Sequence, residues 1–251
     1  MRVLILCVLV AAAACGTGAG AVRQYEYEEE MYLSLDGTAT IYVNSSIAAL
    51  NALRETSFET RPRARIDRDA VRQYFTTPST RVTRVTTSRR RGRQYLHVRL
   101  EADDVRKLGA SAPFAWSSYS LAHQDEAVVY KQAVAGKPDV AAPHEDAEWT
   151  GDELVAFRIH VPSVVEYHNA GPANLRRGNI VVWEQSLGDR LRGAPLELEV
   201  RMQPQSILYR TLILFALMFA AVAVLFGVVI WRIVRAGQKR AGRSSYPPSS
   251  N

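Results

Sequence analysis

The feature that most constrains this chain is an uncharged, apolar stretch near its C-terminus, Thr211–Trp231. As a helix this stretch is about 31 Å long, which matches the roughly 30 Å hydrocarbon core of a bilayer. Tyr209 and Trp231 lie at its two ends, where amphipathic aromatic side chains anchor a span at the membrane interface. Helices of soluble cores rarely run this long without a polar position. The sequence therefore predicts a transmembrane helix over residues 206–233.

The charges on either side of this span indicate its orientation. Residues 234–251 carry Lys and Arg but no acid, whereas Arg210 is the only cation close to the other end. Cytoplasmic flanks hold the excess of Lys and Arg, so we expect the C-terminus inside and residues before 206 outside. The chain ends in the polar, proline-containing sequence SSYPPSSN. We therefore expect residues 234–251 to form a basic, disordered cytoplasmic tail.

The N-terminus has the anatomy of a signal peptide over residues 1–21, because Arg2 precedes the apolar run VLILCVLVAAAA. Two cleavage sites compete. Residues 19–21 (Ala-Gly-Ala) fit the small-x-small rule and would leave Val22 first. Alternatively, residues 12–15 resemble a bacterial lipobox with Cys15 as the lipidated residue, although Ala12 replaces the usual Leu. An uncleaved anchor is a third interpretation, which the glycines of residues 16–20 disfavour.

Residues 22–205 then form one extracytoplasmic domain of ordinary size. The two cysteines of the chain, Cys7 and Cys15, lie in or beside the signal segment, so this domain has no disulfide and depends on its core. The whole chain has a formal charge of +6. The cations after residue 205 account for that excess, which leaves the domain nearly neutral. A nucleic-acid partner is therefore not expected, and no binding motif for one is present.

Within this neutral domain the charge is uneven. Residues 54–99 contain thirteen Arg, no Lys and four acids. Arg binds phosphate groups bidentately, so this region could hold an anionic headgroup or glycan at the membrane surface. The alternative is a solvated basic face that is balanced by the acidic remainder of the domain.

Period-2 alternation of apolar side chains predicts most of the secondary structure. It marks a strand from Tyr25 to Leu35, and the turn Asp36-Gly37 followed by TATIYV completes a hairpin. Short helices are expected after Ser45 or Ser46 and after Asp67 or Asp69, which can cap them. Further alternating strands follow up to Leu196–Met202. We predict an α+β fold with a mostly antiparallel sheet and two or three helices packed on one face, followed by the single transmembrane helix.

A second hairpin is expected from residues 81–100, with RRRGR as its turn. Its exposed arginines are the side chains that we expect to contact an anionic headgroup. They are Arg81, Arg84, Arg89, Arg90, Arg91 and Arg93.

The closing segment of the domain, residues 162–202, resembles that of LppM-type bacterial lipoprotein domains. The matching positions are Pro162, Val165, Asn169, Val182 and Trp183, and the early Asp36-Gly37 turn is also similar. The order of signal segment, α+β domain and C-terminal span matches as well. The resemblance implies binding of anionic, phosphoinositide-type lipids, and it carries no set of catalytic residues.

The search for catalytic and metal-binding residues gives none. No His pair has the spacing of a metal site, and neither a nucleophile with a base nor a phosphate-binding glycine loop is visible. The acidic run of Glu26, Glu28, Glu29 and Glu30 could bind calcium, but a solvated strand face is the simpler interpretation. We expect no enzymatic activity, no metal and no cofactor.

The sequence thus predicts a single-pass protein of a bacterial cytoplasmic membrane, with its N-terminal domain outside. Its expected function is to bind an anionic lipid or envelope component at the membrane surface. The alternative is a structural or assembly partner of an envelope protein complex.

Overall fold

The computed structural model describes residues 25–61, 63–135, 149–150, 153–171 and 178–241. They belong to two compact units, which meet in the sequence between Pro204 and Gln205. The first unit is an α+β domain with mostly antiparallel strands, which confirms the predicted fold class. The predicted signal peptide, the lipidation candidate Cys15 and the last ten residues of the predicted tail lie outside the described residues.

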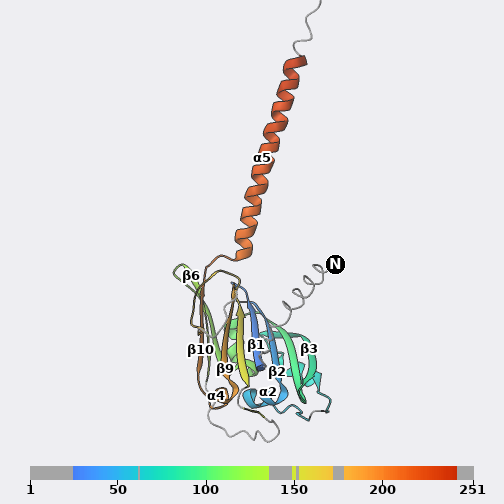
Figure 1. Cartoon of the computed structure of the whole chain (residues 1–251), viewed down its shortest axis with the longest axis vertical. Helices are drawn as coiled ribbons and strands as arrows, with labels where there is room; N and C mark the ends of the chain where they lie inside the picture. The colour runs from blue at the N-terminus through green and yellow to red at the C-terminus, as the bar shows by residue number, and fades with distance from the viewer. Residues whose placement is uncertain (1–24, 62, 136–148, 151–152, 172–177, 242–251) are drawn as a thin grey trace, which may run out of the picture. The chain divides into compact units, whose positions relative to one another are not determined.

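The described strands of this domain form two sheets (Figure 1). The six-stranded sheet has the order β3 (Thr80–Arg90), β4 (Arg93–Ala102), β2 (Ala39–Ser46), β1 (Tyr25–Leu33), β7 (Leu154–His160) and β9 (Ile180–Ser186). The four-stranded sheet has the order β5 (Ser117–Gln124), β6 (Ala127–Val134), β10 (Leu196–Met202) and β8 (Val165–His168). All neighbours are antiparallel except β1 and β7, which are parallel. One hydrophobic core draws residues from both sheets.

Short helices fill the gaps around this core. α2 (Ile47–Arg54) begins at the predicted cap, Ser46, and packs on β1, β2 and β4. α3 (Arg68–Phe75) begins at Asp67, whose carboxylate accepts two backbone N–H groups, and packs on β3. The 3₁₀ turns η1 (Val105–Ala110) and η2 (Ala112–Phe114) precede β5, and α4 (Leu187–Leu191) follows β9.

The alternation predicted for β1 is confirmed, but it carries a carboxylate into the core. Tyr27, Glu29 and Met31 all point inward, and Glu29 is 2% exposed. Glu26 is also buried. The interpretation of the acidic run as a solvated strand face is therefore wrong for these two residues, because each has a cationic partner that a strand pattern does not show. Arg93 pairs with Glu26 at 2.8 Å, and Arg54 pairs with Glu29 at 3.0 Å.

The Arg54–Glu29 pair lies between the two sheets. Arg54 is the last residue of α2, and its side chain is 1% exposed. It also donates to the backbone oxygen of Pro113 at 2.6 Å, and its guanidinium lies 3.6 Å from the centroid of the Trp116 ring. Such stacking and hydrogen bonding offset part of the cost of removing the charge from water.

Glu29 also forms a direct polar link between the sheets. Its Oε1 accepts from the hydroxyl of Tyr119 on β5 at 3.2 Å and from Nε2 of Gln132 on β6 at 3.3 Å. Its Oε2 accepts from the hydroxyl of Tyr27 at 3.1 Å. Burial raises the pKa of both tyrosines, so each remains a protonated donor.

The other side of the six-stranded sheet, which we call the outer face, is polar. A chain of hydrogen bonds crosses it from β3 to β7. Ser88 lies 2.8 Å from Nε2 of His97, and Nδ1 of His97 lies 2.9 Å from Oδ1 of Asn44. Asn44 donates to Glu28 at 3.2 Å, and Glu28 pairs with Arg158 at 3.0 Å. This pattern suits a neutral His97, whose Nδ1–H donates while Nε2 accepts.

The second unit contains one helix, α5 (Ile207–Ala241). Its segment Ile207–Ala236 is long and apolar enough to cross a membrane, with a mean hydropathy of 3.0, and its apolar side chains are exposed. The helix continues past the predicted span of residues 206–233, so the predicted tail begins as helix rather than as disordered chain.

The buried pair predicts a stability measurement. Replacing Arg54 with Ala leaves the Glu29 carboxylate buried without its cation, and we expect the free energy of unfolding to fall by about 3–5 kcal/mol. The double variant Glu29→Leu, Arg54→Met removes both charges, so it should recover much of that loss. Urea unfolding of residues 22–205 measures both. A loss for Arg54→Ala of only about 1 kcal/mol, as for an exposed pair, would contradict this account.

His97 predicts a pH dependence. Burial and the nearby charge of Arg90 lower the pKa of His97 below its ordinary value of about 6.5. The unfolded chain therefore binds a proton more readily than the folded domain, so His97 makes stability fall as the pH drops through about 6.5. The urea concentration at the midpoint of unfolding should be lower at about pH 5 than at about pH 7.5, and this difference should be smaller in His97→Gln than in the parent. The control His123→Gln, at the exposed end of β5, should keep the parent's difference; equal differences in all three proteins would refute the assignment to His97.

Candidate anion-binding site

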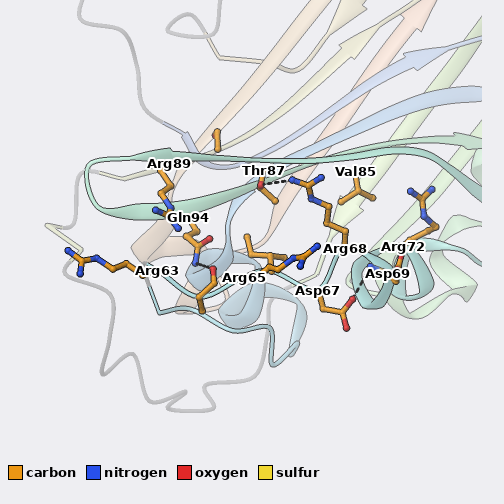
Figure 2. Close-up of a pocket in the computed structure, with 13 residues that line it drawn as sticks. Arg63, Arg65, Asp67, Arg68, Asp69, Arg72, Val85, Thr87, Arg89 and Gln94 are labelled. Carbon is orange, nitrogen blue, oxygen red and sulfur yellow. Dashed lines mark hydrogen bonds between the residues drawn. The ribbon is translucent and has the colours of Figure 1, made fainter.

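A groove lies beside β3, between this strand and the segment that leads into α3. Its volume is about 1030 Å³. Figure 2 shows the residues that surround it. The lining residues are 63–69 and 72, residues 85 and 87–89 of β3, and Gln94 of β4.

Strand alternation explains what β3 contributes. Val85, Thr87 and Arg89 point to the same side of the strand, and that side faces the groove. Gln94 holds the opposite wall, because its side-chain amide donates to the backbone oxygens of Arg61 at 2.6 Å and Ala64 at 3.1 Å. The loop before α3 is thus fastened to the hairpin at a buried residue.

The groove carries an excess of positive charge. Its cations are Arg63, Arg65, Arg68, Arg72 and Arg89, and its acids are Asp67 and Asp69. In the part of the chain that the structure describes, none of these five arginines forms an ion pair. All five are exposed. Their charge is therefore available to a ligand, and guanidinium groups are suited to planar, bidentate contacts with phosphate or carboxylate.

The two acids do not cancel the positive charge of the five arginines. Asp67 is the N-cap of α3, and its Oδ1 accepts the N–H groups of Asp69 and Ala70, each at 3.0 Å. Arg68 reaches across the groove to the hydroxyl of Thr87 at 3.4 Å, whereas Figure 2 shows Arg63 extending away from the others.

Among the described residues, no group of three or more His, Cys, Asp or Glu side chains could hold a metal ion.

The arginines predicted from the sequence do not all lie here. Arg89 lines the groove, but alternation puts its neighbour Arg90 on the outer face, where its guanidinium is 5.7 Å from the centroid of the Tyr95 ring. Arg81 is ion-paired with Glu101 on the adjacent strand. Arg84 is exposed.

The hairpin turn is also tighter than predicted. Only Arg91 and Gly92 form it, both with positive φ, so Arg89, Arg90 and Arg93 belong to strands rather than to a loop. Such a two-residue turn matches the twist of the flanking strands. Arg93 turns toward Glu26 and Glu153, at 2.8 and 3.7 Å. This arginine is therefore committed to carboxylates of its own domain.

Four groove arginines were absent from the predicted site, namely those at positions 63, 65, 68 and 72. The signal for them was the arginine excess of residues 54–99, which includes both the groove and the hairpin. The same excess includes Arg54, which lies in the core. The local sequence does not show which arginines line the groove and which are buried. The two walls of the groove are the loop before α3 and strand β3, which lies about twenty residues later in the chain.

Comparison with solved structures finds a weak likeness to the folded domain of LppM from Mycobacterium tuberculosis, determined by NMR. The TM-score is 0.38 with 14% sequence identity, over 75% of this chain and 95% of that domain. No protein-family model matches the sequence. No curated protein matches it either.

Proposed function

We propose that this chain is a membrane-anchored, non-enzymatic protein whose domain of residues 22–205 binds an anionic lipid headgroup or another anionic envelope component. The observation that carries the proposal is the groove beside β3, which is lined by five exposed arginines and only two acids. An apolar ligand is disfavoured there, because the lining is mainly charged and polar. A cationic ligand is disfavoured by the net charge.

The membrane part of the proposal is supported by α5, whose apolar surface needs a lipid environment. The flanking charges favour a C-terminus in the cytoplasm and a domain outside, in a bacterial cytoplasmic membrane. Only residues 203–206 separate β10 from α5, so the domain is tethered close to the lipid surface. An anionic surface near a groove of this charge attracts each Arg by about 1 kcal/mol.

Vesicle binding tests this function. All core residues lie between Tyr27 and Met202, so the fragment of residues 22–205 carries its complete core. We expect it to sediment with vesicles of phosphatidylcholine and phosphatidylglycerol at low salt, to be released by salt, and not to sediment with phosphatidylcholine alone. Replacing Arg63, Arg65 and Arg68 with Ser should weaken this binding about 100-fold, at about 1 kcal/mol for each charge.

A matched control removes the same charge elsewhere. Lys131, Arg192 and Arg201 have side chains that are 49%, 71% and 52% exposed, and they lie outside the groove. Their triple Ser variant should bind nearly as well as the parent. An equal loss in both triple variants would show a general charge effect, and no binding at low salt would remove the proposal.

A further inference from the structure

The outer face of the six-stranded sheet carries basic side chains on one side of its third strand, β2, and acidic side chains on the other. On the side of β3 and β4 it presents Arg81, Arg84, Arg90 and Arg99 with one acid, Glu101, and Arg93 of this side is paired with Glu26 of β1. On the side of β1, β7 and β9 it presents Glu28, Glu30 and Glu184 with one cation, Arg158. The two halves therefore carry net charges of opposite sign. Between them, β2 presents Thr40, Tyr42 and Asn44.

The basic half places two cations at opposite positions of neighbouring strands. Arg84 and Arg99 are direct partners in the register of β3 and β4, and both are exposed. In the described part of the chain neither forms an ion pair. Like charges at directly opposite positions destabilise a sheet. Arg99 leans over β2, with its guanidinium 5.5 Å from the centroid of the Tyr42 ring. A carboxylate supplied from outside the domain would relieve this repulsion.

The acidic half offers carboxylates that are held in place. Glu30 accepts from the hydroxyl of Tyr32 at 3.3 Å and lies 2.7 Å from Nε2 of His160. The rings of Tyr32 and His160 stack with their centroids 3.9 Å apart, and Tyr32 remains 43% exposed. Glu30 is therefore oriented before any partner arrives.

We propose that the outer face binds the same face of a second copy of this chain, about a two-fold axis that runs along β2. Rotation about this axis exchanges the two sides of β2, so β4 of one copy lies over β1 of the other. Arg99 of each copy then faces Glu30 of the other, and each such contact occurs twice, as in any isologous interface. Thr40 and Tyr42 lie on the axis and meet their own equivalents.

The size and composition of the face suit such a contact. Six strands spaced about 4.8 Å apart make it about 24 Å wide, and seven residues of a paired strand make it about 23 Å long. This is the scale of a small specific interface. Exposed Tyr and Arg side chains are also the residues that most often dominate binding energy. The pairing does not use the groove, so it is independent of the proposed anion binding.

Cross-linking of the full-length protein in its membrane tests the proposal. Packed sheets lie about 10 Å apart, too far for a disulfide, so a short bismaleimide is the reagent. Thr40→Cys lies on the axis and should give a cross-linked dimer. Ser118→Cys, at an exposed position of β5 in the other sheet, is the matched control and should not. The parent chain accounts for any reaction of Cys7 and Cys15. Cross-linking that is absent at position 40, or equal at positions 40 and 118, would overturn the proposal.

A charge exchange makes the test specific for the proposed pairing. In the Thr40→Cys background, Arg99→Glu should lower the dimer yield about tenfold or more, because it places like charges in both symmetric contacts. Glu30→Lys should do the same. Co-expression of the two variants should restore a dimer that contains one chain of each kind, which also shows that both are folded. No restoration would contradict the pairing. A loss of anionic-vesicle binding in Arg99→Glu with an unchanged dimer yield would assign Arg99 to lipid instead.

Discussion

The structure depends on one buried ion pair, that of Arg54 and Glu29. The cost of burying two charges is several kcal/mol for each ion, and close hydrogen-bond partners offset it. Among the atoms of this pair, Nε of Arg54 has no such partner within the described residues. Here the partners come from both sheets: Tyr27 from the six-stranded sheet, and Tyr119 and Gln132 from the four-stranded sheet. The pair therefore favours this arrangement of the two sheets, because its hydrogen-bond partners come from both of them.

The distribution of the remaining arginines follows from this arrangement. Once the side chain of Arg54, the last residue of α2, is held in the core, the chain continues to α3, which packs on β3, and the arginines of this segment line the groove. The strand itself alternates, so Arg89 joins the groove while Arg84 and Arg90 join the outer face. Arginine thus has three roles in this domain: it forms the buried ion pair of the core, it lines the groove, and it makes one half of the outer face basic.

Local patterns predicted the elements of this fold well. The Asp36-Gly37 hairpin, the caps Ser46 and Asp67, and the long apolar helix each rest on signals within a few residues. The division into two sheets and the parallel pairing of β1 with β7 could not be predicted, because periodicity states which side chains are buried but not which strands are neighbours. For the same reason Glu26 and Glu29 were assigned to a solvated face. A charged residue on the apolar side of a strand, as Glu29 is, indicates a buried partner elsewhere in the chain.

Of the thirteen arginines in residues 54–99, Arg54 is committed to the core, and we propose that the five that line the groove bind an anion. Side-chain Nε–H NMR signals of residues 22–205, followed during addition of tripolyphosphate, test it directly. The account predicts that the signals of Arg63, Arg65, Arg68, Arg72 and Arg89 shift together, while that of Arg54 stays unchanged. Equal shifts at exposed arginines outside the groove, such as Arg192 and Arg201, or a shift at Arg54, would contradict it.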